Sequence, residues 1–328
     1  MEATVANTLH VTSSAISFLT CLVVLLCLLR PASVGTGQPL AASRTAAGAW
    51  HKDCLLAVAD GWWQRTPPKV PIPDLPLNIA VRNLADAFTA FNESLAYQWG
   101  WHLYTRCDIR RRSRSEIADL LRSRRLAFMG DSHVRQFHNW LVQAVGGKPY
   151  FVPAKLPESQ HNSVQVVPAL NTTVQINMTH LASEIHRYLE AWSGQWPDLL
   201  LMDASVWHLY TLKNISEYTR QMDGLLGFLK AEVPPTTVLI WLSPPPRHTL
   251  KAPWWNELPA EWIRLYNRVA VDLGFMYPTG PAHHLDLYSL ALDCLPWCSK
   301  DGLHVVDSGY ELALQILANL LAQLEGWR

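Results

Sequence analysis

The chain has 328 residues, and its 27 basic residues balance 27 acidic ones, so the formal net charge is zero. This length suits one α/β domain with additional segments and is enough to bury a full hydrophobic core. The balanced charge gives no strong attraction to nucleic acid, and no Gly-x-Gly-x-x-Gly or Walker-type loop occurs, so we expect no nucleic-acid partner, redox group or bound nucleotide cofactor.

A hydrophobic segment without charges, 11–29, follows a short N-terminal tail, 1–10. At a rise of about 1.5 Å per residue it approaches the roughly 30 Å hydrocarbon core of a bilayer, so we expect a signal anchor and a single-pass membrane protein. A cleaved signal peptide remains the alternative, because the densely apolar part covers only 16–29. Residues 30–49, rich in Ala, Ser, Gly and Thr, are expected to form a flexible stem before one luminal domain, 50–328.

Four Asn-x-Ser/Thr sequons accompany this hydrophobic segment, at Asn92, Asn171, Asn177 and Asn214. Each is a short pattern, and several of them can stay unmodified. Together with the N-terminal segment, they support a luminal glycoprotein domain.

Four of the six cysteines lie outside the hydrophobic segment, an even number for an oxidising compartment. We favour the disulfides Cys54–Cys107 and Cys294–Cys298, although four cysteines allow three pairings. A zinc site of Cys294, Cys298 and His304 is the alternative. It lacks a matching Cys-x-x-Cys pair, so we expect no metal.

Strand and helix patterns alternate along the luminal domain, which predicts a parallel α/β sheet with right-handed crossovers. The expected strands cover 126–129, 197–202, 237–242 and 275–277, with an edge hairpin over 164–178. The expected helices lie within 110–125 and over 134–145, 181–192, 215–230, 262–273 and 308–317.

The first strand leads directly to a candidate nucleophile, Ser132. The run 126–129 is apolar, Gly130 permits a sharp turn, and Asp131 or Ser132 can cap the helix that follows. Ser132 therefore lies at the carboxyl end of a strand beside a helix N-terminus. Ligands of open α/β sheets bind there, and backbone N–H groups at that point stabilise a developing negative charge.

A base for this serine is available before the last helix, in Asp301-Gly302-Leu303-His304. A serine hydroxyl is a weak nucleophile until a positioned imidazole takes its proton. An acid three residues before the histidine can orient the imidazole through its other nitrogen. Each motif alone is a common cap or turn, but the two together are more specific and predict the triad Ser132, Asp301 and His304.

Gly130-Asp131-Ser132-x-x-Arg135-Gln136 together with Asp301-x-x-His304 resembles the GDSL/SGNH-like group, and within it the PC-esterase clan. That clan includes plant trichome-birefringence-like polysaccharide O-acetyltransferases and the luminal domain of the sialic-acid O-acetyltransferase. The similarity covers about residues 50–325. Further matching positions are Cys54, Gly61-Trp62, Trp101, Cys107, Trp207 and Tyr266-Asn267. The resemblance implies an SGNH-like three-layer sandwich with a central, mostly parallel sheet.

Two positions depart from the family pattern. Pro296 stands where plant members have the catalytic histidine, so the acid and base must come from Asp301 and His304, as in the sialic-acid type. Asp203 stands where many SGNH enzymes have an asparagine that donates to the oxyanion, and an ionised aspartate cannot donate. Beyond the Ser132 amide, other backbone N–H groups or the Ser205 hydroxyl are the remaining candidates.

The resemblance implies an O-acetyltransferase in which an acetyl donor, with acetyl-CoA as one candidate, esterifies Ser132, and a glycan or polysaccharide hydroxyl then accepts the acetyl group. Gly130, Asp131, Arg135 and Trp207 are further oxyanion or substrate candidates, although Arg135 can equally form a surface salt bridge. A carbohydrate acetyl-esterase with the same triad and a non-catalytic glycan-binding protein are the alternatives. We expect a Golgi or other secretory-pathway membrane location, or a secreted protein, with a donor-supplying membrane protein as a candidate partner.

Overall fold

A computed structural model describes residues 61–65, 99–103, 111–150, 162–192, 194–247, 260–292, 299, 301–305, 307–324 and 327. All of them belong to one compact unit, Ala49–Arg328. The predicted anchor, the stem, all six cysteines, Pro296 and Asn92 lie outside the described residues. Within the described part of the chain, no helix is both long and apolar enough to cross a membrane.

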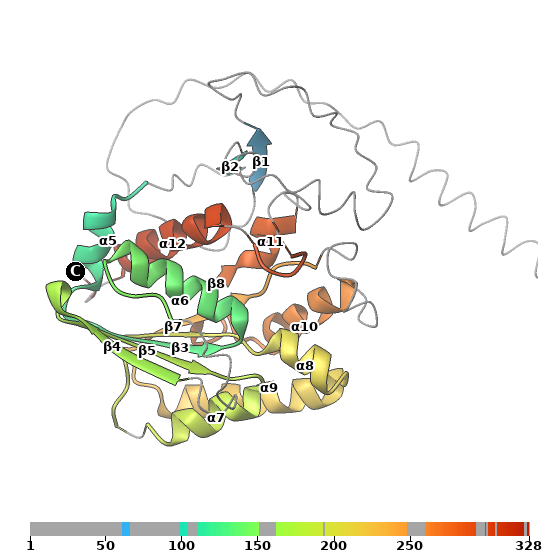
Figure 1. The fold of residues 1–328 in the computed structure, drawn as a ribbon. Coiled ribbons are helices and arrows are strands. Elements are labelled where there is room, and N and C mark those ends of the chain that lie inside the picture. Colours follow the sequence, from blue (N-terminus) through green and yellow to red (C-terminus); the bar gives the residue numbers. More distant parts are fainter. Residues whose placement is uncertain are drawn as a thin grey trace, which may run out of the picture. The chain divides into compact units, whose positions relative to one another are not determined.

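The centre of the fold is a six-stranded sheet with the order β4-β5-β3-β6-β7-β8 (Figure 1). Its strands are β3 (Arg125–Gly130), β4 (Asn162–Val167), β5 (Thr172–Met178), β6 (Leu199–Met202), β7 (Val238–Ser243) and β8 (Ala282–Asp286). All neighbouring pairs are parallel except β4 and β5, which form the expected edge hairpin through a 3₁₀ turn at Pro168–Leu170. A separate antiparallel pair joins β1 (Gly61–Arg65) and β2 (Trp99–Leu103).

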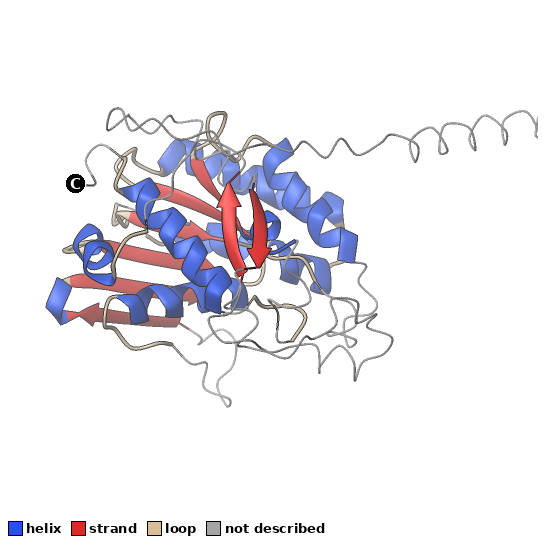
Figure 2. Cartoon of the chain, turned by 90° about the horizontal axis from the view of Figure 1, so that it is seen from above, coloured by secondary structure: helices blue, strands red, loops and turns tan. Residues whose placement is uncertain are grey.

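Helices cover both faces of the sheet (Figures 1 and 2). One face packs against α5 (Arg114–Leu121), α6 (Ser132–Ala144), α11 (Leu287–Leu292) and α12 (Asp307–Leu321). The other packs against α7 (Ala182–Glu190), α8 (Ser205–Thr211), α9 (Ile215–Glu232) and α10 (Ala260–Asp272). Strand β3 serves both cores because its side chains alternate: Leu126 and Phe128 enter the first, and Ala127 and Met129 the second. The three-layer α/β arrangement with a mostly parallel sheet is therefore confirmed.

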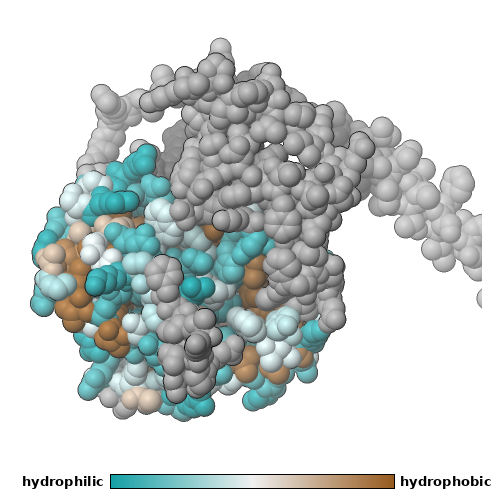
Figure 3. All heavy atoms as spheres, viewed as in Figure 1, coloured by the Kyte–Doolittle hydropathy of each residue, from teal (hydrophilic) through white to brown (hydrophobic). Residues whose placement is uncertain are grey.

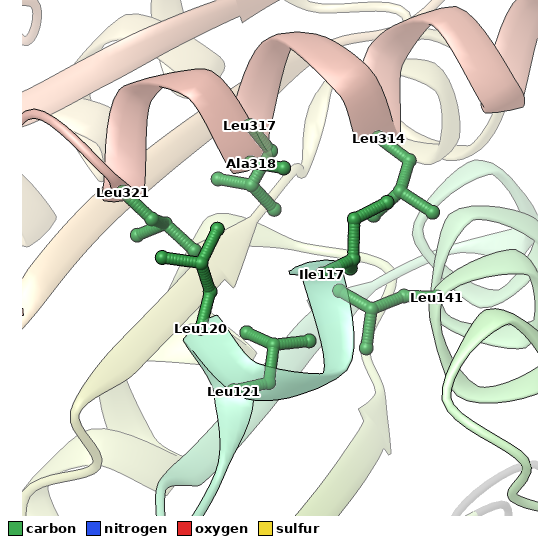
Figure 4. A pocket seen from close by; sticks show the side chains of 8 residues that line it. All are labelled: Ile117, Leu120, Leu121, Leu141, Leu314, Leu317, Ala318 and Leu321. Atoms are coloured by element: carbon green, nitrogen blue, oxygen red, sulfur yellow. The ribbon is translucent and has the colours of Figure 1, made fainter. Parts of the chain in front are cut away.

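The last helix closes the first core against a helix that precedes the whole sheet. Apolar side chains of α5, α6 and α12 meet around a small pocket (Figure 4). Its lining consists of Ile117, Leu120, Leu121, Leu141, Leu314, Leu317, Ala318 and Leu321. The Gln315 side chain also bonds the backbone N–H and C=O of Arg112 at 2.8 and 2.9 Å. The helix that precedes the six-stranded sheet and the helix that follows it thus pack against each other in one core.

One expected strand is wrong. In the segment 275–277, only Met276 forms an isolated bridge, with Ala282, and the strand beside β7 is Ala282–Asp286 instead. Its sequence, Ala-His-His-Leu-Asp, lacks the apolar run of a buried strand because β8 lies at the sheet edge. At the opposite edge of the sheet, the side chains of Val164 and Val166 on β4 are 63% and 58% exposed. On the face of the molecule drawn in Figure 3, hydrophobic residues are interspersed with hydrophilic ones.

Candidate active site

The site lies where the strand order reverses. From β3 the chain passes to β5 on one side and then to β6 on the other, so the carboxyl ends of β3 and β6 border a topological switch point. Ser132 is the first residue of α6, directly after β3, and Asp131 caps the helix by accepting the His133 N–H at 2.8 Å. The structure therefore assigns the helix cap to Asp131 and leaves the Ser132 side chain for chemistry.

Gly130 is required by close packing at this turn. Its φ is +158°, and a Cβ atom there would lie 2.9 Å from the Asp203 carbonyl oxygen. The Asp203 N–H in turn donates to the Met129 carbonyl at 3.1 Å. The chain leaving β6 thus lies directly against the end of β3, and no side chain fits between them.

Ser132, His304 and Asp301 form a continuous hydrogen-bonded chain, although 172 residues separate the serine from the histidine. His304 Nε2 lies 2.7 Å from Ser132 Oγ, and His304 Nδ1 lies 2.6 Å from Asp301 Oδ2. Because the carboxylate is an acceptor, we assign the ring proton to Nδ1, which leaves Nε2 to accept the Ser132 hydroxyl proton. The predicted triad residues are therefore together, in the order that base-assisted attack by a serine requires.

The loop that carries the acid and the base is fixed by its own hydrogen bonds. Asp301 Oδ1 accepts from the backbone N–H groups of Leu303 and His304 at 2.9 and 2.8 Å. Ser299 Oγ accepts from the Gly302 N–H at 2.9 Å and donates to the His304 carbonyl at 2.8 Å. Burial raises the pKa of Asp301, but the hydrogen bonds and charge of His304 outweigh it and hold that pKa below its ordinary value. Asp301 therefore stays ionised beside the imidazole.

A second histidine, His133, packs against the first. The ring centroids of His133 and His304 are 4.8 Å apart at an interplanar angle of 40°, and His133 is fully buried. Burial lowers the pKa of His133 well below its ordinary value, and the neighbouring His304 lowers it further. His133 therefore presents a neutral ring to the base, which fits a partner that becomes positively charged during the reaction.

Two buried carboxyl groups, Asp131 and Asp203, lie behind the nucleophile. Burial raises the pKa of Asp131 well above its ordinary value, and the charge of Asp203 raises it further. Burial likewise raises the pKa of Asp203 to about 6, although hydrogen bonds from Ser205 and Ala204 oppose the shift. Each carboxyl also has one enclosed oxygen without a hydrogen-bond partner in the described structure. The pair therefore favours protonation over two adjacent negative charges.

The expected oxyanion donors are only partly available. The Ser205 hydroxyl is buried and donates its proton to Asp203 Oδ1 at 3.0 Å. It is therefore not available to donate to an oxyanion, which corrects that candidate. Asp203 accepts the Ser205 N–H at 2.9 Å and is itself fully buried. The Ser132 N–H, at the first position of α6, donates to no residue that the structure describes. A free N–H at the first position of a helix is a donor of the kind that can stabilise an oxyanion.

Trp207 is half-buried on α8, close after the end of β6. Its ring stacks on His180, which follows β5, with centroids 4.4 Å apart and an interplanar angle of 23°. Because β5 and β6 flank β3, this pair bridges across the end of the strand that leads to Ser132. The structure thus brings Trp207 to the predicted edge of the sheet. Arg135 is half-buried one helical turn after Ser132.

The described sequons differ in accessibility. Asn171 is exposed at the turn between β4 and β5, and Asn214 is exposed while its side chain caps α9 through the Glu217 N–H. Asn177 is only 4% exposed, and its side-chain oxygen accepts from Gln175 at 2.8 Å. The folded sheet therefore leaves no room for a glycan on Asn177, which corrects that candidate.

Three site residues escaped the sequence analysis: His133, Ser299 and Tyr310. Tyr310, on α12, is buried near Asp131 and Asp301, whose charges contribute after burial to raising its pKa well above the ordinary value. No local pattern marks any of the three, although His133 does adjoin the nucleophile. Among the residues that the structure describes, no His, Cys, Asp and Glu side chains gather as a metal site.

No family model matches the chain. A curated Arabidopsis thaliana protein named Altered Xyloglucan 9 is 19% identical over 257 residues, covering 68% of each chain. Among solved structures, an acetylxylan esterase from Geobacillus stearothermophilus is 14% identical, covering 62% of this chain and 96% of the esterase, with a TM-score of 0.39. A GDSL-like lipase from Bacteroides thetaiotaomicron is 13% identical, covering 61% and 88%, with a TM-score of 0.42. The chain resembles the PC-esterase and GDSL/SGNH-like group, as its two motifs indicated.

Proposed function

We propose that this chain is a serine acyl-transfer enzyme that moves an acetyl group from a donor to a glycan hydroxyl through an ester on Ser132. The observation that carries the proposal is the hydrogen-bonded chain from Ser132 through His304 to Asp301. The similarity to the plant protein, whose name refers to xyloglucan, supports a carbohydrate acceptor.

In the first half-reaction, Ser132 Oγ attacks the carbonyl carbon of the donor while His304 Nε2 takes the hydroxyl proton. The tetrahedral oxyanion forms next to the Ser132 N–H. When this intermediate collapses, the bond to the leaving group breaks and His304 returns the proton to that group. Asp301 stabilises the imidazolium and holds its orientation throughout.

In the second half-reaction, a sugar hydroxyl attacks the acetyl carbon on Ser132 and gives its proton to His304. Collapse releases the acetylated sugar, and the proton returns to Ser132 Oγ. The same steps with water in place of the sugar describe an acetyl-esterase. The choice between the two activities thus depends on how well the sugar competes with water at the acyl-enzyme.

The test uses the full chain in detergent, incubated with acetyl-CoA and, separately, with p-nitrophenyl acetate. Mass spectrometry should find an acetyl group on Ser132, and His304→Ala should prevent its formation. Adding an oligosaccharide acceptor should move the label to the sugar, whereas release as free acetate would indicate an esterase. A folded chain that forms no adduct and shows no turnover with either donor would contradict the proposal and favour a glycan-binding protein.

A further inference from the structure

Arg135 carries a positive charge beside the nucleophile that nothing in the described structure neutralises. It lies three residues after Ser132 on α6, a spacing that places the two side chains on one face of the helix. Arg135 is half-buried as a residue, and its Nε atom is enclosed without a hydrogen-bond partner among the described residues. A guanidinium stays protonated at all physiological pH values, so this charge is permanent.

Other arginines behave differently. Arg122, Arg220 and Arg268 are exposed to water, and each still pairs with a carboxylate one helical turn away. Burial makes an unpaired charge more costly, so Arg135 would be expected to have the firmest partner, but no residue that the structure describes pairs with it. The surface salt bridge considered for Arg135 is not found in the described part of the chain.

The groups around Arg135 leave its charge uncompensated. The charge of Arg135 contributes to the pKa shifts of Asp131, His133, Tyr150 and Tyr310, and Asp131 and His133 flank Ser132 in the chain. Asp131, the only carboxylic acid of these four, is buried and uses one oxygen to cap α6. Its raised pKa further reduces the negative charge that it can offer.

We infer that Arg135 binds an anionic group, a carboxylate or a phosphate, on the molecule that reacts at Ser132. This inference rests on the proposed function, because it assigns the anion to a substrate of the same site. A guanidinium offers a fork of N–H donors that matches the paired oxygens of either group. The anion can belong to the acceptor, as the carboxylate of a uronic acid, or to the donor, as a phosphate beside the acyl-carrying arm.

The test is a binding measurement with probes that differ in a single charged group. Isothermal titration calorimetry of the full chain in detergent compares tri-galacturonate with its methyl ester, and 4′-phosphopantetheine with pantetheine. The chain should bind at least one anionic probe about tenfold to a hundredfold more tightly than the neutral twin. The preferred pair identifies whether the anion comes from the acceptor or the donor.

Arg135→Gln should abolish this preference, and Arg135→Lys should keep part of it, because lysine retains the charge but not the fork. Arg268→Gln is the matched control, since it removes an exposed helical arginine of α10 that already pairs with Asp272 and should leave the preference intact. Thermal unfolding of all variants checks that they fold.

Two results would overturn the inference: a parent chain that binds neither anion more tightly than its twin, or a folded Arg135→Gln variant that keeps the preference. Binding requires no turnover, so the outcome is independent of the acyl-enzyme test. An Arg135-dependent preference without any acetyl-Ser132 would keep the anion site and reject the enzyme.

Discussion

Two serine–histidine pairs lie at the carboxyl edge of the same sheet, and in both a serine Oγ is 2.7 Å from a histidine Nε2. One pair is Ser132 with His304, and the other is Ser243, at the end of β7, with His284 on β8. Their surroundings differ. Ser132 begins a helix and is half-buried, whereas Ser243 is 1% exposed and is followed by three prolines.

The acid separates the two pairs further. Asp301 contacts the imidazole of His304 directly, while Asp286 uses its carboxylate to accept the backbone N–H and hydroxyl of Ser289 at the start of α11. Burial lowers the pKa of His284, which disfavours the imidazolium that base catalysis requires. A short serine–histidine hydrogen bond is therefore not sufficient. The third group, the helix N-terminus and access from solvent distinguish a nucleophile from a packed polar contact.

The largest expected difference between the pairs follows from removing each serine. Ser132→Ala should lower acetyl transfer by about 10⁴-fold or more, since the nucleophile is lost. Ser243→Ala should leave transfer within about twofold and reduce the free energy of unfolding by about 1 kcal/mol, because it removes one buried hydrogen bond. Transfer rates and urea denaturation measure the two effects. Loss of activity in a stable Ser243→Ala chain would make the second pair part of the mechanism.

Replacing Asp301 and Asp286, the acids near the two histidines, should change kcat by different amounts, with a smaller difference than for the two serines. Asp301→Asn should lower kcat by roughly 10³- to 10⁴-fold, because an amide that donates to Nδ1 moves the ring proton to Nε2, which then cannot accept from Ser132. Nitrogen-15 NMR of the imidazole can report this change of tautomer. Asp286→Asn should leave kcat unchanged and weaken only the start of α11. Equal losses of activity in the two variants would remove the distinction between a catalytic and a capping acid.

Asp203 should alter the pH dependence of stability rather than the chemistry. Its pKa is about 6 in the folded chain against an ordinary 3.8, so the folded state binds more protons between these values. The stability that this extra protonation provides is complete below about pH 4 and is lost as the pH rises through about 6. The side chain of the Asp203→Asn variant cannot ionise. The free energy of unfolding of the variant, relative to that of the parent, should therefore increase by on the order of 2 kcal/mol between about pH 4 and pH 7. Parallel pH profiles would contradict this assignment.

The sequence was most informative where the structure depends on neighbouring residues. The end of β3, the turn at Gly130 and a cap at Asp131 or Ser132 are specified within a few positions, and the Asp301–His304 loop closes on itself. Each of these features could be predicted because turns, caps and short loops follow local rules.

Features that depend on residues far away in the sequence could not be predicted from local patterns. Strand β8 is polar in sequence, because an edge strand with His283 and His284 has neither an apolar run nor a clear alternation. His133 gains its place in the site only because the loop of His304 packs on it from 171 residues away. The hydroxyl of Ser205 was plausible as a donor until α8, which periodicity had not indicated, directed it to Asp203.

The separation of 172 residues between Ser132 and His304 also orders events during biosynthesis. The ribosome completes β3 and its serine first and, at about 5–20 residues per second, needs on the order of ten seconds to reach the histidine. The helix that covers the apolar face of α5, α12, follows immediately after that histidine. Synthesis of the histidine loop and α12 therefore supplies the base for Ser132 and covers the apolar face of α5 at the same stage. A nascent chain interrupted before Ser299 lacks the histidine of the triad and leaves the apolar face of α5 without α12.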